Sequence, residues 1–588
     1  MVRLAIVEKA KCKPTVCNHD CAKCCPINKK GEECIFFANE KAQEADTSGE
    51  VSSAKASIDE KLCVGCSLCV KRCPFEAIQI VNLPTVKEED LVHRYGPNGF
   101  ALYGLPMPKE NSVLGLLGRN GIGKSTAVKI LAGKDKINFG GKPITPKEFF
   151  KGNEMMNYFD DLAGKKVAYK PQNLSSIAVD LKVSELLEKV GDMKMAQRLM
   201  DELGIGALMQ NKLNKLSGGE LQKVAIVAAV IREADIYFFD EPLAFLDIAE
   251  RLKVSDFIKK IAEGKTVIVV EHDLLILDYL TEYLNIFFGA AGAFGLVSGV
   301  KSSANGVNAY LDGYLKEENL QIRDKALNFN FTKNPPSVGY KIATWPAFEK
   351  KFDSFNLKVD SGEVHQNHVI GILGKNGTGK TTFVKCLAGE EKVIVNGVEQ
   401  KLDLDLKISY KPQYLFTDSE DMVRDVMFRE KISKKVAQMF SLEVLSHKKI
   451  KDLSGGELQR FSIARCLAKE ADLYLLDEPS AYLDVEERIS CAKAIKDLMV
   501  DKEATAFVVD HDLLLVSYLA DNIINFKGIS GKEGHALKIK NFEDGITELL
   551  QSLDITLRKD KQSGRPRINK KNSVLDRGQK EKGEWAIF

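Results

Sequence analysis

Two short stretches decide the fold of this chain: Gly118-Arg-Asn-Gly-Ile-Gly-Lys124-Ser125 and Gly374-Lys-Asn-Gly-Thr-Gly-Lys380-Thr381. Both match G-x4-G-K-[ST]. Each follows an apolar, strand-like run, residues 113–117 and 369–373, and precedes a helical pattern. In this context the motif forms a phosphate-binding loop, or P-loop. Its glycines let successive N–H groups curl around phosphates, and the helix N-terminus adds a favourable dipole. The sequence therefore predicts two α/β nucleotide-binding domains in tandem.

The P-loop residues have distinct expected roles. Lys124 and Lys380 are expected to reach the β- and γ-phosphates, and Ser125 and Thr381 to hold Mg²⁺. The other expected nucleotide contacts are Gly118, Asn120, Gly121, Gly123, Thr126, Gly374, Asn376, Gly377, Gly379 and Thr382.

Further motifs follow each P-loop in the same order, so the chain contains an internal repeat. They are Lys170-Pro-Gln172 and Lys411-Pro-Gln413; Leu216-Ser-Gly-Gly-Glu-Leu-Gln222 and Leu453-Ser-Gly-Gly-Glu-Leu-Gln459; Ile236-Tyr-Phe-Phe-Asp240-Glu241 and Leu473-Tyr-Leu-Leu-Asp477-Glu478; Asp247 and Asp484; and Glu271-His272-Asp273 and Asp510-His511-Asp512.

Each motif has a physical task. An apolar strand ending in Asp-Glu delivers Asp240 or Asp477 to a magnesium shell, and leaves Glu241 or Glu478 to orient or deprotonate water. The Ser-Gly-Gly-Glu turns open helices, so their N–H groups form a second anion site. The residues of these turns are Ser217, Gly218, Gly219, Glu220, Ser454, Gly455, Gly456 and Glu457.

The two halves differ in one interval. Lys124 and Gln172 are 48 residues apart, whereas Lys380 and Gln413 are 33 apart. The extra residues include two helical stretches, 146–150 and 154–162, which we interpret as a helix–loop–helix insertion. Two interpretations stay open: a decorated surface loop, or a docking element for a large partner.

Eight cysteines near the N-terminus form two runs, Cys12-x4-Cys17-x3-Cys21-x3-Cys25-Pro26 and Cys63-x2-Cys66-x2-Cys69-x3-Cys73-Pro74. The second run has the spacing of the bacterial two-cluster ferredoxin motif, in which the Cys before Pro reaches the other cluster. The pattern predicts two [4Fe–4S] clusters. Their expected ligands are Cys63, Cys66, Cys69 and Cys25 for one, and Cys12, Cys17, Cys21 and Cys73 for the other.

Other interpretations of the cysteines remain. Zinc also accepts thiolates at short spacing, and disulfides are disfavoured because nothing like a secretory signal precedes Cys12. Cys24 and Cys34 stay unassigned. Cys386, Cys466 and Cys491 are scattered singly, as core residues are.

Composition indicates a soluble protein of three or more domains. The chain has 588 residues, 44% of them hydrophobic and 28% charged, and a formal net charge of +2. This charge argues neither for nor against a nucleic-acid partner. The longest apolar stretch, residues 286–300, is too short to span a bilayer. We expect a buried strand followed by a Gly-rich turn there.

The motif set resembles the ATP-binding-cassette (ABC) superfamily over both repeats. That resemblance implies γ-phosphate sensing by His272 and His511, and signature turns that cap the ATP held by the opposite cassette. Two composite sites are then expected. One joins Lys124, Gln172, Asp240, Glu241 and His272 to Ser454, Gly455 and Gly456. The other joins Lys380, Gln413, Asp477, Glu478 and His511 to Ser217, Gly218 and Gly219. Asp247, Asp484, Glu220 and Glu457 are further expected nucleotide-binding residues, and Gln172 and Gln413 are expected magnesium ligands.

Twin cassettes behind a two-cluster domain resemble ABC subfamily E, the RNase L inhibitor family of ribosome-recycling ATPases. Further segments support the resemblance: His93-Arg-Tyr95, whose tyrosine is expected to stack on adenine; a hinge at Leu311-Asp-Gly-Tyr314 with Arg323; and Arg565-Pro-Arg-Ile-Asn-Lys570 near the C-terminus. Phe288-Gly-Ala-Ala-Gly-Ala-Phe294-Gly295 and Lys223 depart from the family pattern. Phe348 and Phe352 are both candidates for stacking on adenine in the second cassette.

The resemblance implies five segments. They are a ferredoxin-like α+β iron–sulfur domain (1–80), a first cassette (81–298, insertion about 144–164), a hinge (299–335), a second cassette (336–540), and a C-terminal hinge with a basic tail (541–588). The tail is expected to brace the cassettes or to contact rRNA. Lys71 and Arg72, beside a cluster, are further candidates for RNA contact.

The implied function is ATP hydrolysis to ADP and phosphate that closes head-to-tail cassettes and splits post-termination ribosomes into subunits, with a link to translation initiation. The expected partners are the small ribosomal subunit and its rRNA, a release factor or its rescue-factor relative, and initiation factors. Two [4Fe–4S] clusters, Mg²⁺ and two ATP sites are expected in a cytoplasmic monomer without a membrane partner. The alternatives are an ATPase that gates electron transfer from the clusters, and an energy subunit of a transporter.

Overall fold

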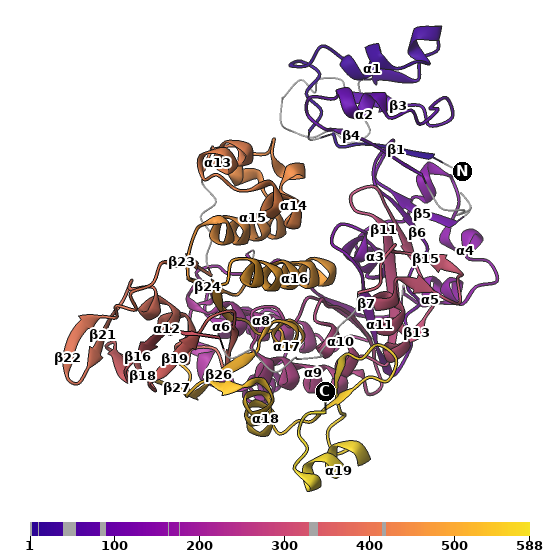
Figure 1. Ribbon diagram of the computed structural model, residues 1–588. Coiled ribbons are helices and arrows are strands. Elements are labelled where there is room, and N and C mark those ends of the chain that lie inside the picture. The colour runs from indigo at the N-terminus through magenta and orange to yellow at the C-terminus, as the bar shows by residue number, and fades with distance from the viewer. Residues whose placement is uncertain are drawn as a thin grey trace.

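Each half of the chain is built on a mixed β-sheet whose central strands are parallel and buried. The computed structural model describes residues 3–9, 11–38, 55–82, 90–162, 164–175, 177–327, 339–413 and 419–587 (Figure 1). The P-loop strands, β7 (Ser112–Leu117) and β20 (Val369–Gly374), lie inside their sheets, and every residue of both strands is buried. Continuous apolar runs are typical of strands covered on both faces.

The first sheet has the order β5-β6-β12-β11-β7-β10-β9-β8, with β13 beside β11. Its other strands are β5 (Leu91–Arg94), β6 (Ala101–Tyr103), β8 (Val167–Lys170), β9 (Ile236–Asp240), β10 (Thr266–Val270), β11 (Tyr283–Ala290), β12 (Phe294–Val297) and β13 (Lys301–Ser302). The helices are α3 (Lys124–Leu131), α4 (Pro146–Phe149), α5 (Glu154–Leu162), α6 (Val183–Glu188), α7 (Met193–Glu202), α8 (Gly218–Val230), α9 (Ile248–Ala262), α10 (Leu274–Leu280) and α11 (Ser303–Asp312).

The expected buried strand and turn are present in the stretch 286–300, and a further strand follows the turn. The stretch contains most of β11, a turn, and a second strand, β12, that pairs antiparallel with β11. Phe287 and Phe294 are buried on opposite sides of the turn. The segment is therefore a hairpin. In the described residues no helix is long and apolar enough to cross a bilayer.

The second sheet repeats this arrangement in the order β22-β21-β17-β18-β27-β26-β20-β25-β24-β23, with β28 beside β26. Its other strands are β17 (Phe348–Lys351), β18 (Asn356–Val359), β21 (Lys392–Val395), β22 (Val398–Lys401), β23 (Ile408–Lys411), β24 (Leu473–Asp477), β25 (Thr505–Val509), β26 (Asn522–Ile529), β27 (Glu533–Ala536) and β28 (Lys540–Asn541), and β16 (Lys341–Trp345) pairs with β19 (Gly362–His365) beside it. The helices are α12 (Lys380–Leu387), α13 (Val423–Arg429), α14 (Lys434–Met439), α15 (Gly455–Ala468), α16 (Val485–Asp501), α17 (Leu513–Leu519) and α18 (Phe542–Leu553).

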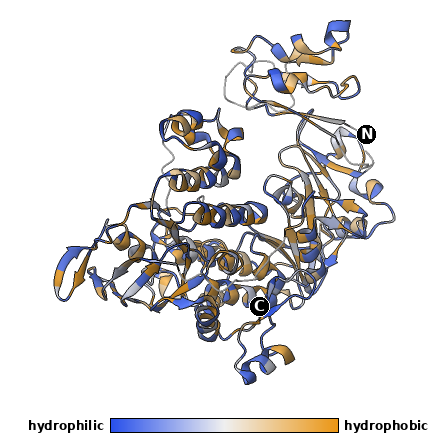
Figure 2. Cartoon of the chain, viewed as in Figure 1, coloured by the Kyte–Doolittle hydropathy of each residue, from blue (hydrophilic) through white to orange (hydrophobic). Residues whose placement is uncertain are grey.

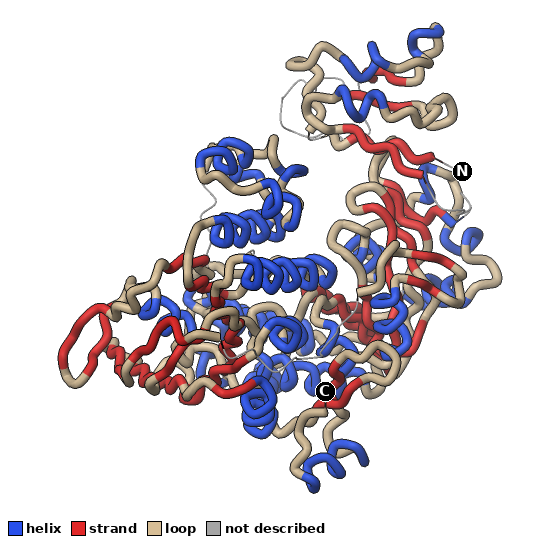
Figure 3. The backbone as a smooth tube through the Cα atoms, in the orientation of Figure 1, coloured by secondary structure: helices blue, strands red, loops and turns tan. Residues whose placement is uncertain are grey.

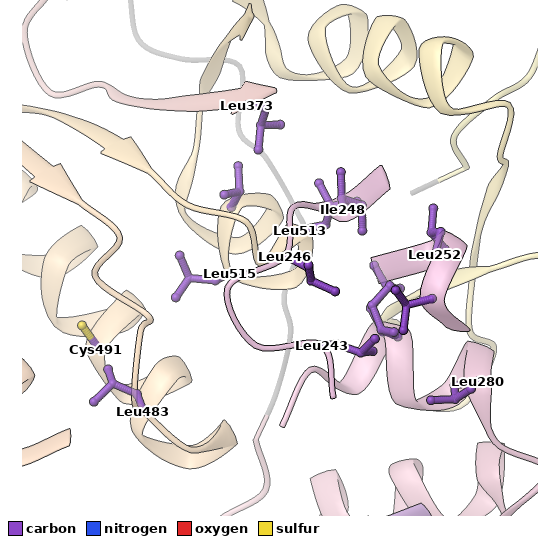
Figure 4. Close-up of a cluster of buried hydrophobic side chains, with 14 of the residues drawn as sticks. Leu243, Leu246, Ile248, Leu252, Leu280, Leu373, Leu483, Cys491, Leu513 and Leu515 are labelled. Carbon is purple, nitrogen blue, oxygen red and sulfur yellow. The ribbon is translucent and has the colours of Figure 1, made fainter. Parts of the chain in front are cut away.

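Helices α13, α14 and α15 form a lobe without strands, in which α15 packs against β23 and β24 of the second sheet (Figure 1 and Figure 3). Hydrophobic segments run through the interior of both halves (Figure 2). The cores of the two halves are also continuous with each other. Leu246 and Ile248 of the first half belong to the same buried cluster as Leu513 and Leu515 of the second (Figure 4).

The insertion between the first P-loop and Gln172 consists of α4 and α5, the two helices expected there. The rings of Phe139 and Phe149 stack with centroids 4.5 Å apart, and those of Phe150 and Phe159 with centroids 5.6 Å apart. The Tyr158 hydroxyl donates to the carbonyl of Leu131 at the end of the P-loop helix (2.7 Å). The insertion therefore has its own aromatic core, which is joined to the first half.

The N-terminal domain combines β1 (Arg3–Val7) and β4 (Ile78–Asn82), β2 (Ile35–Ala38) and β3 (Lys55–Ile58), and the short helices α1 (Asp20–Cys24) and α2 (Leu68–Arg72). It lies above the first sheet in Figure 1. Buried Asn98 of the first half joins the two units: its side chain accepts from Ile58 N–H (2.8 Å) and donates to Ala5 and Ile58 carbonyls. Arg94 pairs with Glu60 at 2.6 Å.

The C-terminal segment packs on the first half. It contains β29 (Leu557–Lys559), β30 (Pro566–Ile568) and α19 (Val574–Lys582). Arg565, only 1% exposed, and Arg567 both pair with the buried carboxylate of Asp278 on α10, at 3.0 and 2.7 Å. The part of the basic tail that contains these arginines therefore braces the two halves, one of the two roles expected for it.

Candidate nucleotide sites between two cassettes

The two P-loops have the same geometry. Gly123 and Gly379 precede the helices α3 and α12 with φ of 93° and 94°, and a Cβ atom at Gly123 would lie 2.7 Å from the Phe100 ring. Lys124 Nζ donates to the carbonyls of Gly118 and Arg119 at 2.7 and 2.6 Å, and Lys380 repeats these contacts on Gly374 and Lys375. Each lysine therefore folds back on the loop that would cradle phosphates.

Burial lowers the pKa of both P-loop ammonium groups to about 8. Carboxylates oppose this shift, and in each case the strongest is on the other half: Asp484 for Lys124 and Asp247 for Lys380. The electrostatic environment of each P-loop thus already includes the opposite half of the chain.

Glu241 lies between two other expected site residues, Gln172 and His272. Its Oε1 accepts from Gln172 Nε2 at 2.8 Å and is 3.3 Å from His272 Nε2. In the second half Glu478 Oε1 is 2.8 Å from Gln413 Nε2 and 3.6 Å from His511 Nε2. Burial raises the pKa of Glu241, but His272, Lys124 and Gln172 outweigh it and hold the pKa at about 2. The carboxylate is therefore ionised, as a group that orients water requires.

The expected magnesium-side residues also come together. Burial and the charge of Glu241 raise the pKa of the Asp240 carboxyl, while the Ser125 hydroxyl opposes the rise. Burial raises the pKa of Asp477 to about 6, and Thr381 opposes it in the same way. An Asp, a hydroxyl residue and a nearby Gln form an oxygen-rich set of the kind that Mg²⁺ prefers.

Two carboxylates connect the halves reciprocally. Asp484 Oδ2 accepts from the N–H of Asn120 in the first P-loop (3.1 Å), and Asp247 Oδ2 accepts from the N–H of Asn376 in the second (2.7 Å). The Oδ1 atom of each aspartate caps its own helix, α16 or α9. Each P-loop is therefore contacted by the half to which it does not belong.

The signature turns begin α8 and α15, as expected. Ser217 and Ser454 are the N-caps, and Glu220 and Glu457 complete capping boxes with them. In the described residues no hydrogen bond joins Ser217, Gly218, Gly219, Ser454, Gly455 or Gly456 to the opposite P-loop. Around the P-loops the halves are therefore joined by other residues, among them Asp247 and Asp484, and the expected contacts between signature turn and opposite P-loop are not found in the described residues.

Comparison of the halves separates the two adenine-stacking candidates. Tyr95 follows β5, its N–H donates to the Phe100 carbonyl, and its side chain is 48% exposed. Phe352 follows β17, its N–H donates to the Phe355 carbonyl, and it is 45% exposed. Phe348 lies in β17 and is 3% exposed. Phe352 thus occupies the position equivalent to Tyr95, and Phe348 belongs to the core.

The N-terminal thiols fall into two neighbourhoods. Burial raises the pKa of Cys21 to about 11, and the thiols of Cys73, Cys17 and Cys12 lie close enough to contribute to this increase. Burial raises the pKa of Cys69 to about 12, and the nearby thiols of Cys24, Cys63 and Cys66 raise it further. Burial also raises the pKa of Cys34 to about 12, to which the nearby Cys25 and Cys63 contribute. In the described part of the chain no three His, Cys, Asp or Glu side chains are arranged to hold a single metal ion.

Family models match these regions. The ABC transporter model matches residues 108–244 and 357–481, a 4Fe–4S binding domain matches 56–79, and a possible Fer4-like domain in RNase L inhibitor matches 2–33. ABC transporter E family member 1 of Arabidopsis thaliana is 39% identical over 100% of this chain and 98% of its own length. The chain belongs to ABC subfamily E.

Other subfamily E proteins are equally similar over their full length. Translation initiation factor RLI1 of Saccharomyces cerevisiae is 39% identical over 100% of this chain and 98% of its own. A model of ribosome-bound archaeal Pelota and ABCE1 matches with a TM-score of 0.90 and 42% identity, covering 100% of this chain and 99% of that one. A complex of the archaeal ribosomal stalk protein aP1 and the archaeal ribosome recycling factor aABCE1 matches with a TM-score of 0.81 and 43% identity. This match covers 86% of this chain and 100% of that one.

This subfamily E chain is therefore an ABC ATPase with an iron–sulfur binding domain. Its site also contains residues to which sequence reasoning gave no role. Lys170 and Gln222 contact the backbone of Glu241, and Glu486 accepts from Tyr310 and Arg323 of the hinge. The repetition of Lys170 as Lys411 was available in the sequence. Glu486 has no such repeat, because Ala249 stands at the matching position.

Proposed function

We propose that this chain is an ATP-driven ribosome recycling factor that splits post-termination ribosomes into subunits by closing two head-to-tail cassettes. The supporting observation is the reciprocal pair of hydrogen bonds from the Asn120 and Asn376 N–H groups to Asp484 and Asp247. Because each P-loop is contacted by the opposite cassette, nucleotide bound there would hold both cassettes together. Hydrolysis would remove the γ-phosphate and let them separate.

The chemical roles follow from the site geometry. Lys124 and Lys380 would turn from their loop carbonyls to the β- and γ-phosphates. Ser125, Gln172 and Asp240, and in the other site Thr381, Gln413 and Asp477, would hold Mg²⁺, which would neutralise charge on the phosphates. Glu241 and Glu478 would orient the attacking water, steadied by His272 and His511. Tyr95 and Phe352 would stack on the adenines.

Two [4Fe–4S] clusters fit the thiol neighbourhoods. Cys12, Cys17, Cys21 and Cys73 would bind one cluster, and Cys25, Cys63, Cys66 and Cys69 the other. In a cubane each thiolate binds a different iron, so the four sulfurs do not converge on one point as they do for a single zinc ion. Cys24 and Cys34 lie beside the second set as additional thiols. Bound clusters would make this small domain rigid.

The rigid domain would transmit cassette motion to the ribosome. Asn98 and Glu60 fix it to the first cassette, and Glu76 lies 3.2 Å from His447 of the second. The proposed partners are the small ribosomal subunit with its rRNA, a release factor or its rescue-factor relative, and initiation factors, in the cytoplasm. The relatives described as ribosome-bound, as a recycling factor and as an initiation factor support this choice.

The test is subunit dissociation. The purified protein, with ATP and a release or rescue factor, is expected to convert post-termination ribosomes into free subunits in a sucrose gradient. The Glu241→Gln and Glu478→Gln variants are expected to remain bound to the small subunit, whereas a matched change at exposed Glu263, Glu263→Gln, behaves like the unaltered protein. Absence of splitting by the unaltered protein contradicts the proposed function. Normal release by both site variants contradicts the roles given to the two glutamates.

A further inference from the structure

The two proposed water-orienting glutamates share an unusual backbone conformation. Glu241 has φ of 46° and Glu478 has φ of 49°, in the left-handed region that residues with a side chain rarely adopt. Such conformations persist only where surrounding groups determine them. The same conformation at equivalent positions of both halves indicates that specific contacts hold it.

A buried lysine supplies one of those contacts. Lys170 is the last residue of β8, which runs parallel to β9 and pairs Lys170 with Phe239, one residue before Asp240. Its Nζ donates to the carbonyls of Asp240 and Glu241 at 2.8 and 3.0 Å. In the second half Lys411 donates to the carbonyls of Asp477 and Glu478 at 2.8 and 3.4 Å.

These lysines are not part of ordinary ion pairs. Each is 1% exposed, and within the described ranges neither has a carboxylate oxygen at salt-bridge distance. Burial of an ammonium group is costly unless its protons are bound. Their hydrogen bonds instead go to the backbone on either side of the strained glutamate, so their position is explained by that turn.

A buried glutamine supplies the other contact. Gln222 Nε2 donates to the Glu241 carbonyl at 3.3 Å, and Gln459 Nε2 donates to the Glu478 carbonyl at 2.6 Å. Both glutamines are 0% exposed. Each lies five residues after the N-cap serine of its signature helix, so Gln222 and Gly218 share one face of α8 four residues apart.

We propose that Lys170 with Gln222, and Lys411 with Gln459, are positioning residues that clamp the backbone of the water-orienting glutamates. We further propose that each glutamine carries the occupancy of one ATP site to the glutamate of the other. The first turn of α8 is the signature expected to complete the second ATP site, which contains Lys380. Gln222 lies on the same helix and contacts the backbone of Glu241 in the first ATP site, which contains Lys124. This inference rests on the proposed roles of the glutamates and the signatures.

The first experiment is a double-mutant cycle in the full-length protein carrying its clusters. Glu478→Gln silences the second site, and ATP turnover then reports the first. Gln222→Met, which keeps the side-chain volume, is expected to lower kcat on the order of 10- to 100-fold with KM within twofold. In the presence of Glu241→Gln the same change is expected to have less than a threefold effect. Equal effects in both backgrounds, or no effect in either, overturn the clamp.

The control is Gln579→Met. Gln579 is also buried and its Nε2 donates to two backbone carbonyls, of Leu557 and Glu584 at 2.9 Å each, in the C-terminal segment. It is expected to lower the melting temperature without changing kcat. A failure of the proposed glutamate role is seen separately, because Glu241→Gln in the Glu478→Gln background would then leave turnover unchanged.

The second experiment tests communication between the sites. The first-site turnover is compared with the second site holding ATP, in Glu478→Gln, and with the second site unable to bind it, in Lys380→Ala. We expect the two rates to differ at least threefold when Gln222 is present and to agree within experimental error in the Gln222→Met variant. A difference of the same size in both cases shows that the signal does not pass through Gln222.

Discussion

Asp247 Oδ2 accepts a 2.7 Å hydrogen bond from the N–H of Asn376, although these residues lie in different cassettes. Its other carboxylate oxygen caps α9 of its own cassette. Asp484 and Asn120 repeat the relationship at 3.1 Å. The Asp247 side chain thus contacts both the first turn of α9 in its own cassette and the P-loop of the other cassette. Movement of either cassette therefore changes the surroundings of the other cassette's nucleotide.

Removal of the Asp247 carboxylate should impair the opposite site. With the first site silenced by Glu241→Gln, we expect Asp247→Ala to reduce ATP turnover at the second site at least tenfold. The lost helix cap costs about 1 kcal/mol in addition. Asp192→Ala is the matched control, because Asp192 caps α7 through Met195 N–H and is exposed. Equal turnover in the two variants would show that capping alone accounts for Asp247.

Asp278 should be a critical residue for stability. Its carboxylate forms ion pairs with Arg565 and Arg567, and Arg565 is almost completely buried. Removing one partner of a buried pair leaves an uncompensated charge and costs roughly 3–5 kcal/mol. We expect Asp278→Ala to lower the free energy of unfolding in urea by about that amount. The exposed pair of Asp160 and Lys147 is the control, and Asp160→Ala should cost no more than about 1 kcal/mol. Similar values for both variants would contradict the bracing role of the tail.

Glu486 of the second cassette should stabilise the hinge. It accepts from the Tyr310 hydroxyl and pairs with Arg323, both in the hinge, and lies 3.6 Å from Arg119 of the first P-loop. Its counterpart in the first cassette is Ala249, which offers no carboxylate. We expect Glu486→Ala to speed amide hydrogen exchange in the hinge about tenfold, because the buried Tyr310 and the partly buried Arg323 lose their acceptor. Asp497→Ala, on the exposed side of the same helix, should leave hinge exchange unchanged.

Phe352 should stack on adenine and Phe348 should not. Stacking of a base on an aromatic ring is worth about 1–3 kcal/mol. Phe352→Ala is therefore expected to weaken ATP binding at the second site about 5- to 150-fold without changing the melting temperature, and Phe352→Tyr to preserve binding. Phe348→Val is expected to lower the melting temperature, because Phe348 belongs to the core. The account is wrong here if Phe352→Ala binds ATP normally.

The affinity for ATP should fall in alkaline solution. In the free protein, burial holds the pKa of Lys124 and Lys380 at about 8, and phosphate charges would raise it again. Between pH 8 and the pKa of the complex, binding therefore takes up one proton per site. The dissociation constant should rise about tenfold per pH unit there and stay flat below pH 7. Calorimetry at pH 8.5 in two buffers of different ionisation enthalpy measures the proton uptake, and zero uptake contradicts the pKa values.

The repeat, the P-loops and the helix–loop–helix insertion were predictable because each depends on local patterns. Gly118–Ser125 needs its glycines where backbone approaches phosphate, and α4 and α5 follow apolar spacing. The equivalence of Phe352 and Tyr95 was not readable, since aromatic residues at both 348 and 352 fit the sequence. It requires the register in which Phe352 and Tyr95 each follow the first strand of a hairpin.

The individual contacts of Arg565, Glu486 and Lys170 with distant parts of the chain could not be predicted from the sequence. Nothing in the composition of the basic tail distinguishes Arg565, which is buried against Asp278, from the exposed tail residue Lys571. Glu486 has no repeat partner, so the internal symmetry gave no reason to examine it. Lys170 was visible twice as Lys-Pro-Gln, but its target is a backbone carbonyl, and backbone acceptors leave no trace in a sequence.

The central claim is that each ATP site is finished by the other cassette. The most direct measurement is single-turnover ATP hydrolysis at the first site of the full-length protein, with the second site silenced by Glu478→Gln and the opposite signature altered by Ser454→Arg. The account predicts at least a tenfold loss of first-site hydrolysis, although Ser454 lies far along the chain from Lys124 and Glu241. Unchanged hydrolysis would contradict it.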